Sequence, residues 1–186
     1  MLRLLVLLLL ASGCMPSAGP ERPEVSHKQQ RLLRVEFREA WTAAHAAIAE
    51  TPLRITADDE NQGTMTLFLR RIARLRADEL ERDLTRIADL SAARNRGLEV
   101  LTEYVVEYDL SFTRMEDDAT RLEVATRIAV IDKSEAMIIG GMVTVIPRRF
   151  DVPSKGVLEK ELMLAIGSRL FVAEEMLYSF GLLGRD

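Results

Sequence analysis

The spacing of apolar residues along the chain changes from helical to strand-like and back again. Between residues 31 and 50, apolar positions recur every three or four residues, which places them on one face of a helix. Pro52 ends this helix. The apolar face carries Leu33, Phe37, Trp41, Ala44 and Ile48. Trp41 is expected to anchor the core, and a ligand contact is the alternative interpretation.

Alternation of apolar and polar residues predicts two antiparallel hairpins in the middle of the chain. In the first, runs of alternating residues at 53–57 and 65–69 flank the turn-forming segment DDENQG. The second pairs residues 99–113 with residues 120–132 across the segment MEDDA. Its two faces differ, one apolar and one rich in Glu and Asp, so we expect one buried and one solvated face, with cross-strand ion pairs to Arg121 and Arg127.

Two segments depart from these patterns. Residues 71–97 alternate basic and acidic side chains, which is typical of a solvated, ion-paired helix; a protein-contact surface that includes Arg71 and Arg74 is the alternative. The run AMIIGGMVTVIP at 136–147 is apolar without alternation. We expect a short buried strand with a Gly-Gly bulge there. The alternative is an exposed segment that contacts a membrane, ligand or partner through Ile138, Ile139 and Met142.

Helical periodicity returns after residue 154 and continues almost to the C-terminus. A one-faced sheet must bury its apolar face, and the two helices are the natural cover. The sequence therefore predicts an α+β fold of the helix-grip type. In this fold an antiparallel sheet is covered on one face by an N-terminal helix and a long C-terminal helix.

The first fourteen residues predict export and lipid attachment. Arg3 precedes the apolar run Leu4–Leu10, which is too short to cross a membrane and is typical of a signal peptide. Ala11-Ser12-Gly13-Cys14 resembles a bacterial lipobox. We expect a signal peptide at 1–13, a lipidated tether at 14–30 that begins with acylated Cys14, and one domain at 31–186 with the charged insert at about 71–97. An ordinary signal peptide with a stray Cys, or a buried N-terminal strand, is the alternative.

Composition narrows the classes of function. Cleavage after Gly13 removes one base and no acid from a chain of net charge −4, so the mature protein is mildly acidic and lacks the basic surface of a nucleic-acid-binding protein. Cys14 is the only Cys, and His27 and His45 are the only His. With no zinc-ligand spacing and no phosphate-binding Gly-rich loop, we expect no metal, no cofactor and no enzymatic activity. The acidic residues at 58–60 are interpreted as a solvated turn rather than a calcium loop.

The segment VEFREAWTAAHAAIAETPLRITADDENQGTMTL resembles the opening of the domains in BamC-type outer-membrane assembly lipoproteins. The matching residues are Phe37, Trp41, Ile48, Ile55, Asp58, Asp59, Gly63 and Met65. The resemblance covers about a fifth of the chain and extends further as an order of elements, although there is room for one such domain rather than two. It implies a non-enzymatic role in the cell envelope.

Two hypotheses for function follow. The first is a lipoprotein of a Gram-negative outer membrane that faces the periplasm and serves as an accessory or scaffold subunit of an outer-membrane assembly or maintenance complex. Met15, directly after the lipidated Cys, favours the outer over the inner membrane. The second is a carrier of lipid or another hydrophobic ligand, with a cavity between the sheet and the C-terminal helix lined by Met163, Met176, Ile138 and Ile139.

Overall fold

The computed structural model describes residues 27–72, 77–139 and 141–179. The expected signal peptide, Cys14, the tether as far as residue 26, and Arg74 lie outside the described residues. Side chains at 171–179, Met176 among them, and the side chain of Ile139 are also outside the description.

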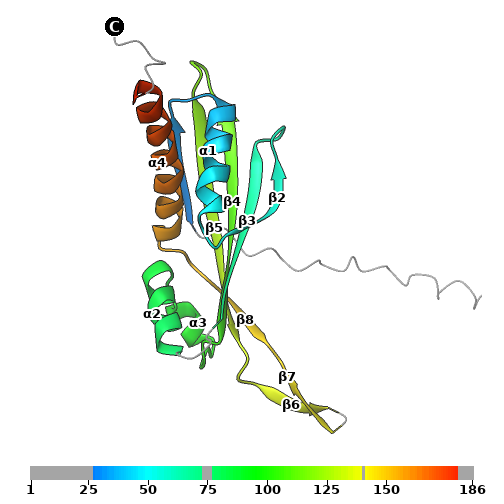
Figure 1. Cartoon of the computed structure of the whole chain (residues 1–186). Helices are drawn as coiled ribbons and strands as arrows, with labels where there is room; N and C mark the ends of the chain where they lie inside the picture. The colour runs from blue at the N-terminus through cyan, green and yellow to red at the C-terminus, as the bar shows by residue number, and fades with distance from the viewer. Residues whose placement is uncertain (1–26, 73–76, 140, 180–186) are drawn as a thin grey trace, which may run out of the picture.

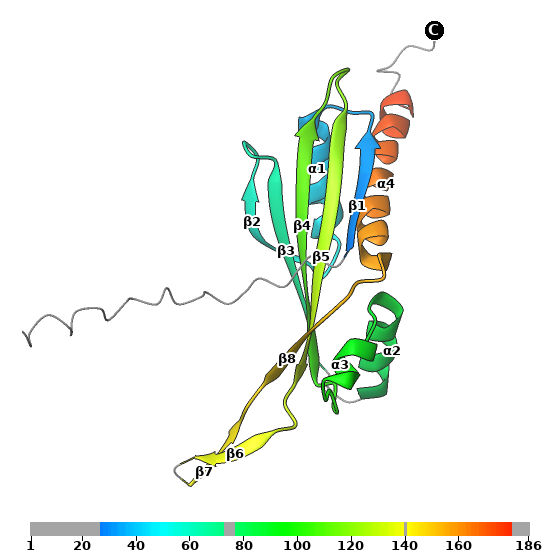
Figure 2. The same ribbon diagram turned by 180° about the vertical axis from the view of Figure 1, so that it is seen from behind.

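An antiparallel sheet forms the centre of the molecule, as Figures 1 and 2 show. Its strands lie in the order β1-β5-β4-β3-β2, and β8 pairs with β5 on the same edge as β1. The long hairpin of β4 and β5 is its spine. The strands are β1 (His27–Leu33), β2 (Arg54–Asp59), β3 (Thr64–Ile72), β4 (Glu103–Arg114), β5 (Thr120–Asp132) and β8 (Arg148–Val152).

Two helices cover one face of this sheet, which confirms the predicted α+β fold class. α1 (Phe37–Ala49) and α4 (Val157–Ser179) run side by side on that face (Figure 1), while Figure 2 shows the face without them. Two shorter helices, α2 (Ala77–Ile87) and α3 (Ser91–Asn95), form the charged insert near the start of α4. One face of α2 packs against the core and buries Leu80, Leu84 and Ile87.

The core lies between the sheet and the helices because alternate residues of the strands point to the same face. In β4 the buried positions on this face are Tyr104, Val106, Tyr108, Leu110 and Phe112. The ring of Trp41 stacks on Phe37 at 5.9 Å between centroids and meets Phe112 edge-on at 5.2 Å. Trp41 is buried, as the helical spacing predicted.

The structure begins the first helix later than the sequence pattern indicated. Residues 27–33 form β1, which pairs with β5, and helical geometry starts at Phe37 after the extended residue Glu36. Leu33 is buried from the end of a strand rather than from a helix. Its spacing of four from Phe37 fits a helix, but the hydrogen bonds available at the edge of β5 favour the strand.

The expectation of a buried strand at 136–147 is wrong. These residues contain a separate two-stranded hairpin, formed by β6 (Ala136–Ile139) and β7 (Met142–Val145). The hairpin projects from the end of the sheet (Figures 1 and 2), and its described side chains are exposed. Within the described part of the chain, no helix combines the length and apolar character that a membrane crossing requires.

Candidate functional site

The projecting hairpin is the candidate functional site. We call this hairpin, residues 136–139 and 141–145, the apolar arm. Gly141, in the turn between the two strands, has a φ of +83°, a conformation that suits Gly far better than other residues. In the arm Ile138 lies opposite Val143, and Met137 lies opposite Thr144.

Both faces of the apolar arm are apolar and exposed. Residues directly opposite each other in a hairpin share a face, and successive residues alternate between faces. One face therefore carries Ile138 and Val143, which are 77% and 72% exposed. The other carries Met137 and Met142, which are 55% and 72% exposed. Among the described residues no core packs against either face, so the arm presents contact surface on both sides.

Charged side chains surround the base of the arm. Arg148 donates to the carboxylate of Glu135 at 2.7 Å, and the backbone N–H of Ile146 donates to the carbonyl of Glu135 at 3.0 Å. The guanidinium of Arg148 also lies over the ring of Phe150, 5.1 Å from its centroid. The arm is thus an apolar tip on a polar, internally paired base.

A second charged cluster lies next to that base. Glu103 is almost fully buried and accepts hydrogen bonds from Arg70 at 2.6 and 3.0 Å and from Lys133 at 2.8 Å. The hydrogen bonds from Arg70 hold the pKa of Glu103 below its ordinary value, and Lys133 acts in the same direction against the effect of burial. This pairing satisfies the buried carboxylate and leaves no group free for acid–base chemistry.

The structure separates the candidate contact residues of the sequence. Ile138 and Met142 lie on the apolar arm, and Ile139 lies on it by its backbone position. Arg71 lies near the end of β3 in register with Tyr104, in the main sheet rather than on the arm. Burial raises the pKa of Tyr104, and the neighbouring guanidinium of Arg71 opposes this shift. The side chain of Arg71 is exposed, but it lies beside the core rather than on the apolar arm.

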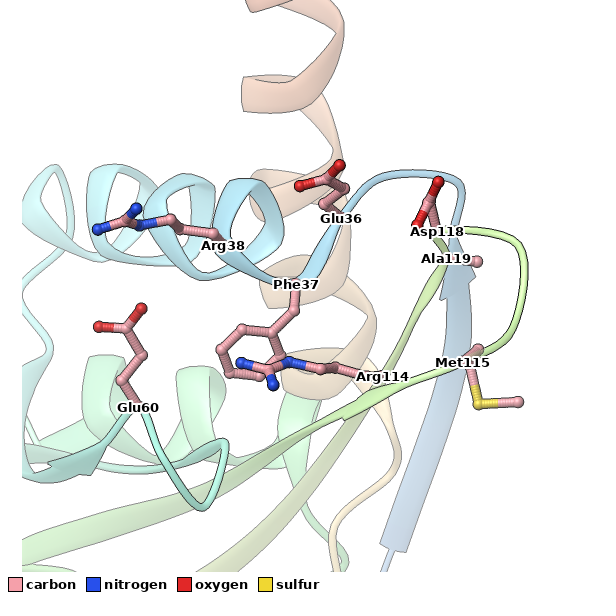
Figure 3. Close-up of a pocket in the computed structure, with 8 residues that line it drawn as sticks. All are labelled: Glu36, Phe37, Arg38, Glu60, Arg114, Met115, Asp118 and Ala119. Atoms are coloured by element: carbon pink, nitrogen blue, oxygen red, sulfur yellow. The ribbon is translucent and has the colours of Figure 1, made fainter.

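A hollow of about 480 Å³ lies at the opposite end of the molecule, between the start of α1 and the turn that joins β4 and β5. Figure 3 shows Arg114 lying across the ring of Phe37, with a cation-to-centroid distance of 4.5 Å. The other lining residues are three acids, one base and two uncharged residues: Glu36, Glu60, Asp118, Arg38, Met115 and Ala119. Such a mixture favours no single ligand charge, and the hollow is best described as a polar surface.

The outer face of the sheet carries cross-strand ion pairs, as the alternation predicted for Arg127, but it is less solvated than expected, because Glu103 is almost fully buried. Arg127 is nearly buried there, and it pairs with Glu107 at 3.4 Å and with Asp109. Lys28 on β1 pairs with Glu123 on β5. These ion pairs join neighbouring strands, and their long side chains shield small residues such as Ala125 and Ala129 from water.

A buried polar network joins the start of α4 to the sheet. Glu159 is fully buried; its carboxylate accepts hydrogen bonds from the hydroxyl of Thr126 and, at 3.1 Å, from the hydroxyl of Ser154. Burial raises the pKa of nearby Tyr108, and the charge of Glu159 acts in the same direction. The network has an acid and hydroxyl groups, but it is closed to solvent and its contacts are structural.

Two other kinds of site were considered among the described residues, a metal site and a ligand cavity under α4. Among them, no group of three or more His, Cys, Asp and Glu side chains could hold a metal ion. The side chains of α4 that face the sheet, including Leu162, Met163 and Ile166, belong to the same core as the strands beneath them. Ile138 is on the apolar arm, remote from this contact, so it does not line a space under α4 as the carrier hypothesis expected.

Comparison with known proteins adds a distant structural likeness. No family model matches the chain, and no curated protein matches it. Among solved structures, it is similar to a DUF4468 family protein from Bacteroides ovatus ATCC 8483, with 10% sequence identity and a TM-score of 0.30 over 86% of this chain and 88% of that one.

The exposed residues Met137, Val143 and Val145 were missed by the sequence interpretation. Their signal was present: the Gly-Gly pair divides two short apolar runs, and Gly-Gly is a preferred dipeptide of two-residue hairpin turns. Interpreting the pair as a bulge led to one buried strand instead of two exposed ones.

Proposed function

We propose that the protein is a non-enzymatic cell-envelope lipoprotein, anchored through acylated Cys14, that acts as an accessory or scaffold subunit of an outer-membrane assembly or maintenance complex. The observation that carries the proposal is the apolar arm. A chain that keeps a large apolar surface outside a filled core is built for contact with another body. The lipobox-like segment and the BamC-like opening of the domain support an envelope location for that contact.

The proposal expects both lipid attachment and stable association with other envelope components. Fatty-acid labelling should mark the wild-type protein and be lost in Cys14→Ser, which should also leave the membrane fraction. Affinity purification of the wild-type protein from native membranes should recover an outer-membrane protein in constant proportion. Absence of acyl label on the wild-type protein, or recovery of the protein alone under mild extraction, would contradict the proposal.

Photo-crosslinking at the two ends of the molecule identifies which surface contacts a protein partner. Photo-crosslinking residues placed at Asp118, beside the hollow, and at Glu116, on the same turn, report contacts at one end of the molecule; a residue placed at Ile138 reports contacts of the apolar arm. A scaffold should give a reproducible protein crosslink from at least one of these ends. Uniform absence of protein crosslinks at both ends would contradict the scaffold role.

A further inference from the structure

We propose that the apolar arm inserts its tip into the surface of the phospholipid bilayer that holds the lipidated N-terminus. The inference rests on the proposed function in taking Cys14 as the anchor, and it goes further by assigning the arm to lipid rather than to protein. Its evidence is the chemistry of the arm, the polar base, and the direction in which the chain enters the sheet.

Exposure on both faces favours lipid over a protein surface. A flat protein surface covers one face of a hairpin and leaves the other in water. In this arm Ile138 and Val143 would be covered while Met137 and Met142 stayed exposed, or the reverse. Acyl chains surround an inserted element on all sides, so a bilayer removes both faces from water at once.

The distribution of charge along the chain marks a boundary at the base of the arm. Residues 136–147 contain no Asp, Glu, Lys, Arg or His, whereas Glu135 and Arg148 form an ion pair immediately outside them. Lys133 and Arg149 are also paired, with Glu103 and Asp151. An apolar tip bounded by charged groups matches the boundary between acyl chains and headgroups. Because the base is internally neutralised, insertion should depend weakly on salt.

The arm is too short to cross the membrane. Each of its strands has four residues and spans roughly 13 Å, against a hydrocarbon thickness of about 30 Å. The outer edges of a two-stranded hairpin also carry unpaired backbone groups, which are costly in hydrocarbon. Both facts limit the arm to shallow insertion, with the edges still in contact with headgroups and water.

The entry of the chain into the sheet places the anchor on the same side as the arm. β1 is antiparallel to β5, and His27 lies opposite Thr126 whereas Leu33 lies opposite Thr120. β1 therefore starts at its end nearest the arm and runs away from it. The chain therefore enters the sheet at the end of β1 that lies nearer the arm.

The lengths of the two connections also agree. His27 lies opposite Thr126 in the sheet. The separation in sequence from Cys14 to His27 equals the separation from Thr126 to Ile139 in the arm. At 3.3–3.6 Å per extended residue, each segment reaches about 45 Å at most. The lipidated Cys and the tip of the arm can therefore meet the same leaflet. In that orientation the hollow beside Phe37 points away from the bilayer, toward the periplasm.

Fluorescent labels at the two ends of the molecule test this orientation. Acylation occupies the thiol of Cys14, the only natural Cys, so Ile138→Cys and Asp118→Cys each provide one labelling site. The mature lipidated variants are labelled with an environment-sensitive dye and reconstituted into vesicles of phosphatidylethanolamine and phosphatidylglycerol, with and without doxyl-labelled lipid. We expect a blue shift, quenching by doxyl lipid and shielding from iodide at position 138. The label at position 118 should remain in water.

A charge placed on the arm provides the second variant. Val143→Asp, combined with Ile138→Cys, puts a carboxylate opposite the label and should abolish its quenching by lipid. Its melting temperature should be unchanged, because Val143 is 72% exposed. Equal iodide access at positions 138 and 118 in vesicles would overturn the inference, as would unchanged quenching after Val143→Asp. Shielding that occurs only after addition of membrane proteins would assign the arm to a protein and would also overturn it.

The same preparation separates failure of this inference from failure of the proposed function. Mass spectrometry of the purified protein reports whether Cys14 is acylated, independently of the label on the arm. Acylated protein with an arm that remains in water retains the lipoprotein proposal and rejects insertion. If the protein proves unacylated, Cys14 is replaced by Ser so that only position 138 carries the label; quenching by lipid then retains insertion and rejects the lipoprotein proposal.

Discussion

Glu159, in the first turn of α4, accepts a hydrogen bond from the hydroxyl of Thr126 on β5, and both side chains are fully buried. Ser154 donates to the second carboxylate oxygen at 3.1 Å and accepts from the backbone N–H of Gly156 at 3.1 Å. Gln29 on β1 donates to the carbonyl of Gly156 at 2.9 Å. Glu159 thus fixes the start of the covering helix against β5, and Gln29 joins the residue just before that helix to β1.

Removal of this carboxylate should destabilise the domain. In Glu159→Ala the buried hydroxyls of Thr126 and Ser154 lose their acceptor, and an unsatisfied buried polar group costs about 1–3 kcal/mol. Urea denaturation should show a lower midpoint with an unchanged slope. The control is Glu161→Ala, which removes an exposed pair with Arg86 and should change the free energy of unfolding by less than about 1 kcal/mol. Equal losses in the two variants would reject the role assigned to Glu159.

Gly63 should tolerate substitution less well than Gly141. Gly63 has a φ of +65°, and a Cβ added there would lie 2.3 Å from the carbonyl oxygen of Phe112. Gly63→Ala should cost about 1–3 kcal/mol from backbone strain alone, with a further loss from displacement of β4. Gly141→Ala meets the same conformational restriction at φ +83° but no neighbouring atom within 4 Å. Thermal unfolding should therefore show the larger decrease in Gly63→Ala.

A charge on the apolar arm should leave the fold intact in solution. Ile138→Asp should shift the melting temperature by no more than a few degrees, because the native side chain already lies in water. Val130→Asp is the matched comparison, since Val130 is fully buried on β5 and an unpaired charge there is expensive. Circular dichroism should show a folded Ile138→Asp and an unfolded or strongly destabilised Val130→Asp. Global unfolding of Ile138→Asp would show that the arm packs in the core.

Acid should weaken the domain partly through Glu103. Its pKa in the folded protein is lower than the ordinary value of 4.5, chiefly because of the hydrogen bonds from Arg70. The unfolded chain therefore binds the proton more readily, so this contribution to stability is complete above pH 4.5 and disappears as the pH falls through the folded-state pKa. Denaturation curves measured from pH 7 downward should show the loss.

Substitution of Glu103 isolates its part in this acid dependence. Glu103→Gln should lower the free energy of unfolding at pH 7 by about 1.5–3 kcal/mol, the range for hydrogen bonds to charged groups, and should flatten the dependence below pH 4.5. Glu116→Gln, on the exposed turn between β4 and β5, is the control and should retain the wild-type profile. An unaltered pH profile in Glu103→Gln would contradict the assignment.

Local periodicity was sufficient to predict the two main hairpins, the covering helices and the buried position of Trp41. In β4, for example, Tyr104 and Tyr108 alternate with Glu103 and Glu107, so the face that carries both tyrosines is the one expected in the core. The charged helix α2 also followed from its alternation of basic and acidic residues, and the structure buries Leu80, Leu84 and Ile87 on its inner face. Such features depend on residues close together in the chain.

The remaining features depend on partners that a local pattern does not contain. β1 is a strand because β5 offers it an unpaired edge, and no residue between 27 and 33 indicates that edge. The apolar arm was misinterpreted for a related reason: apolar side chains normally predict burial, but nothing in the described fold lies over Ile138 or Val143.

The pairing of β1 with β5 determines the order in which the sheet can be completed. Gln30 and Glu123, joined by a hydrogen bond across these strands, are 93 residues apart in the sequence. Closing so long a loop is slow compared with forming the local hairpin of β4 and β5. While the chain emerges N-terminus first, β1 must wait unpaired until β5 has followed it. The first strand to leave the site of synthesis or export is therefore among the last to be folded.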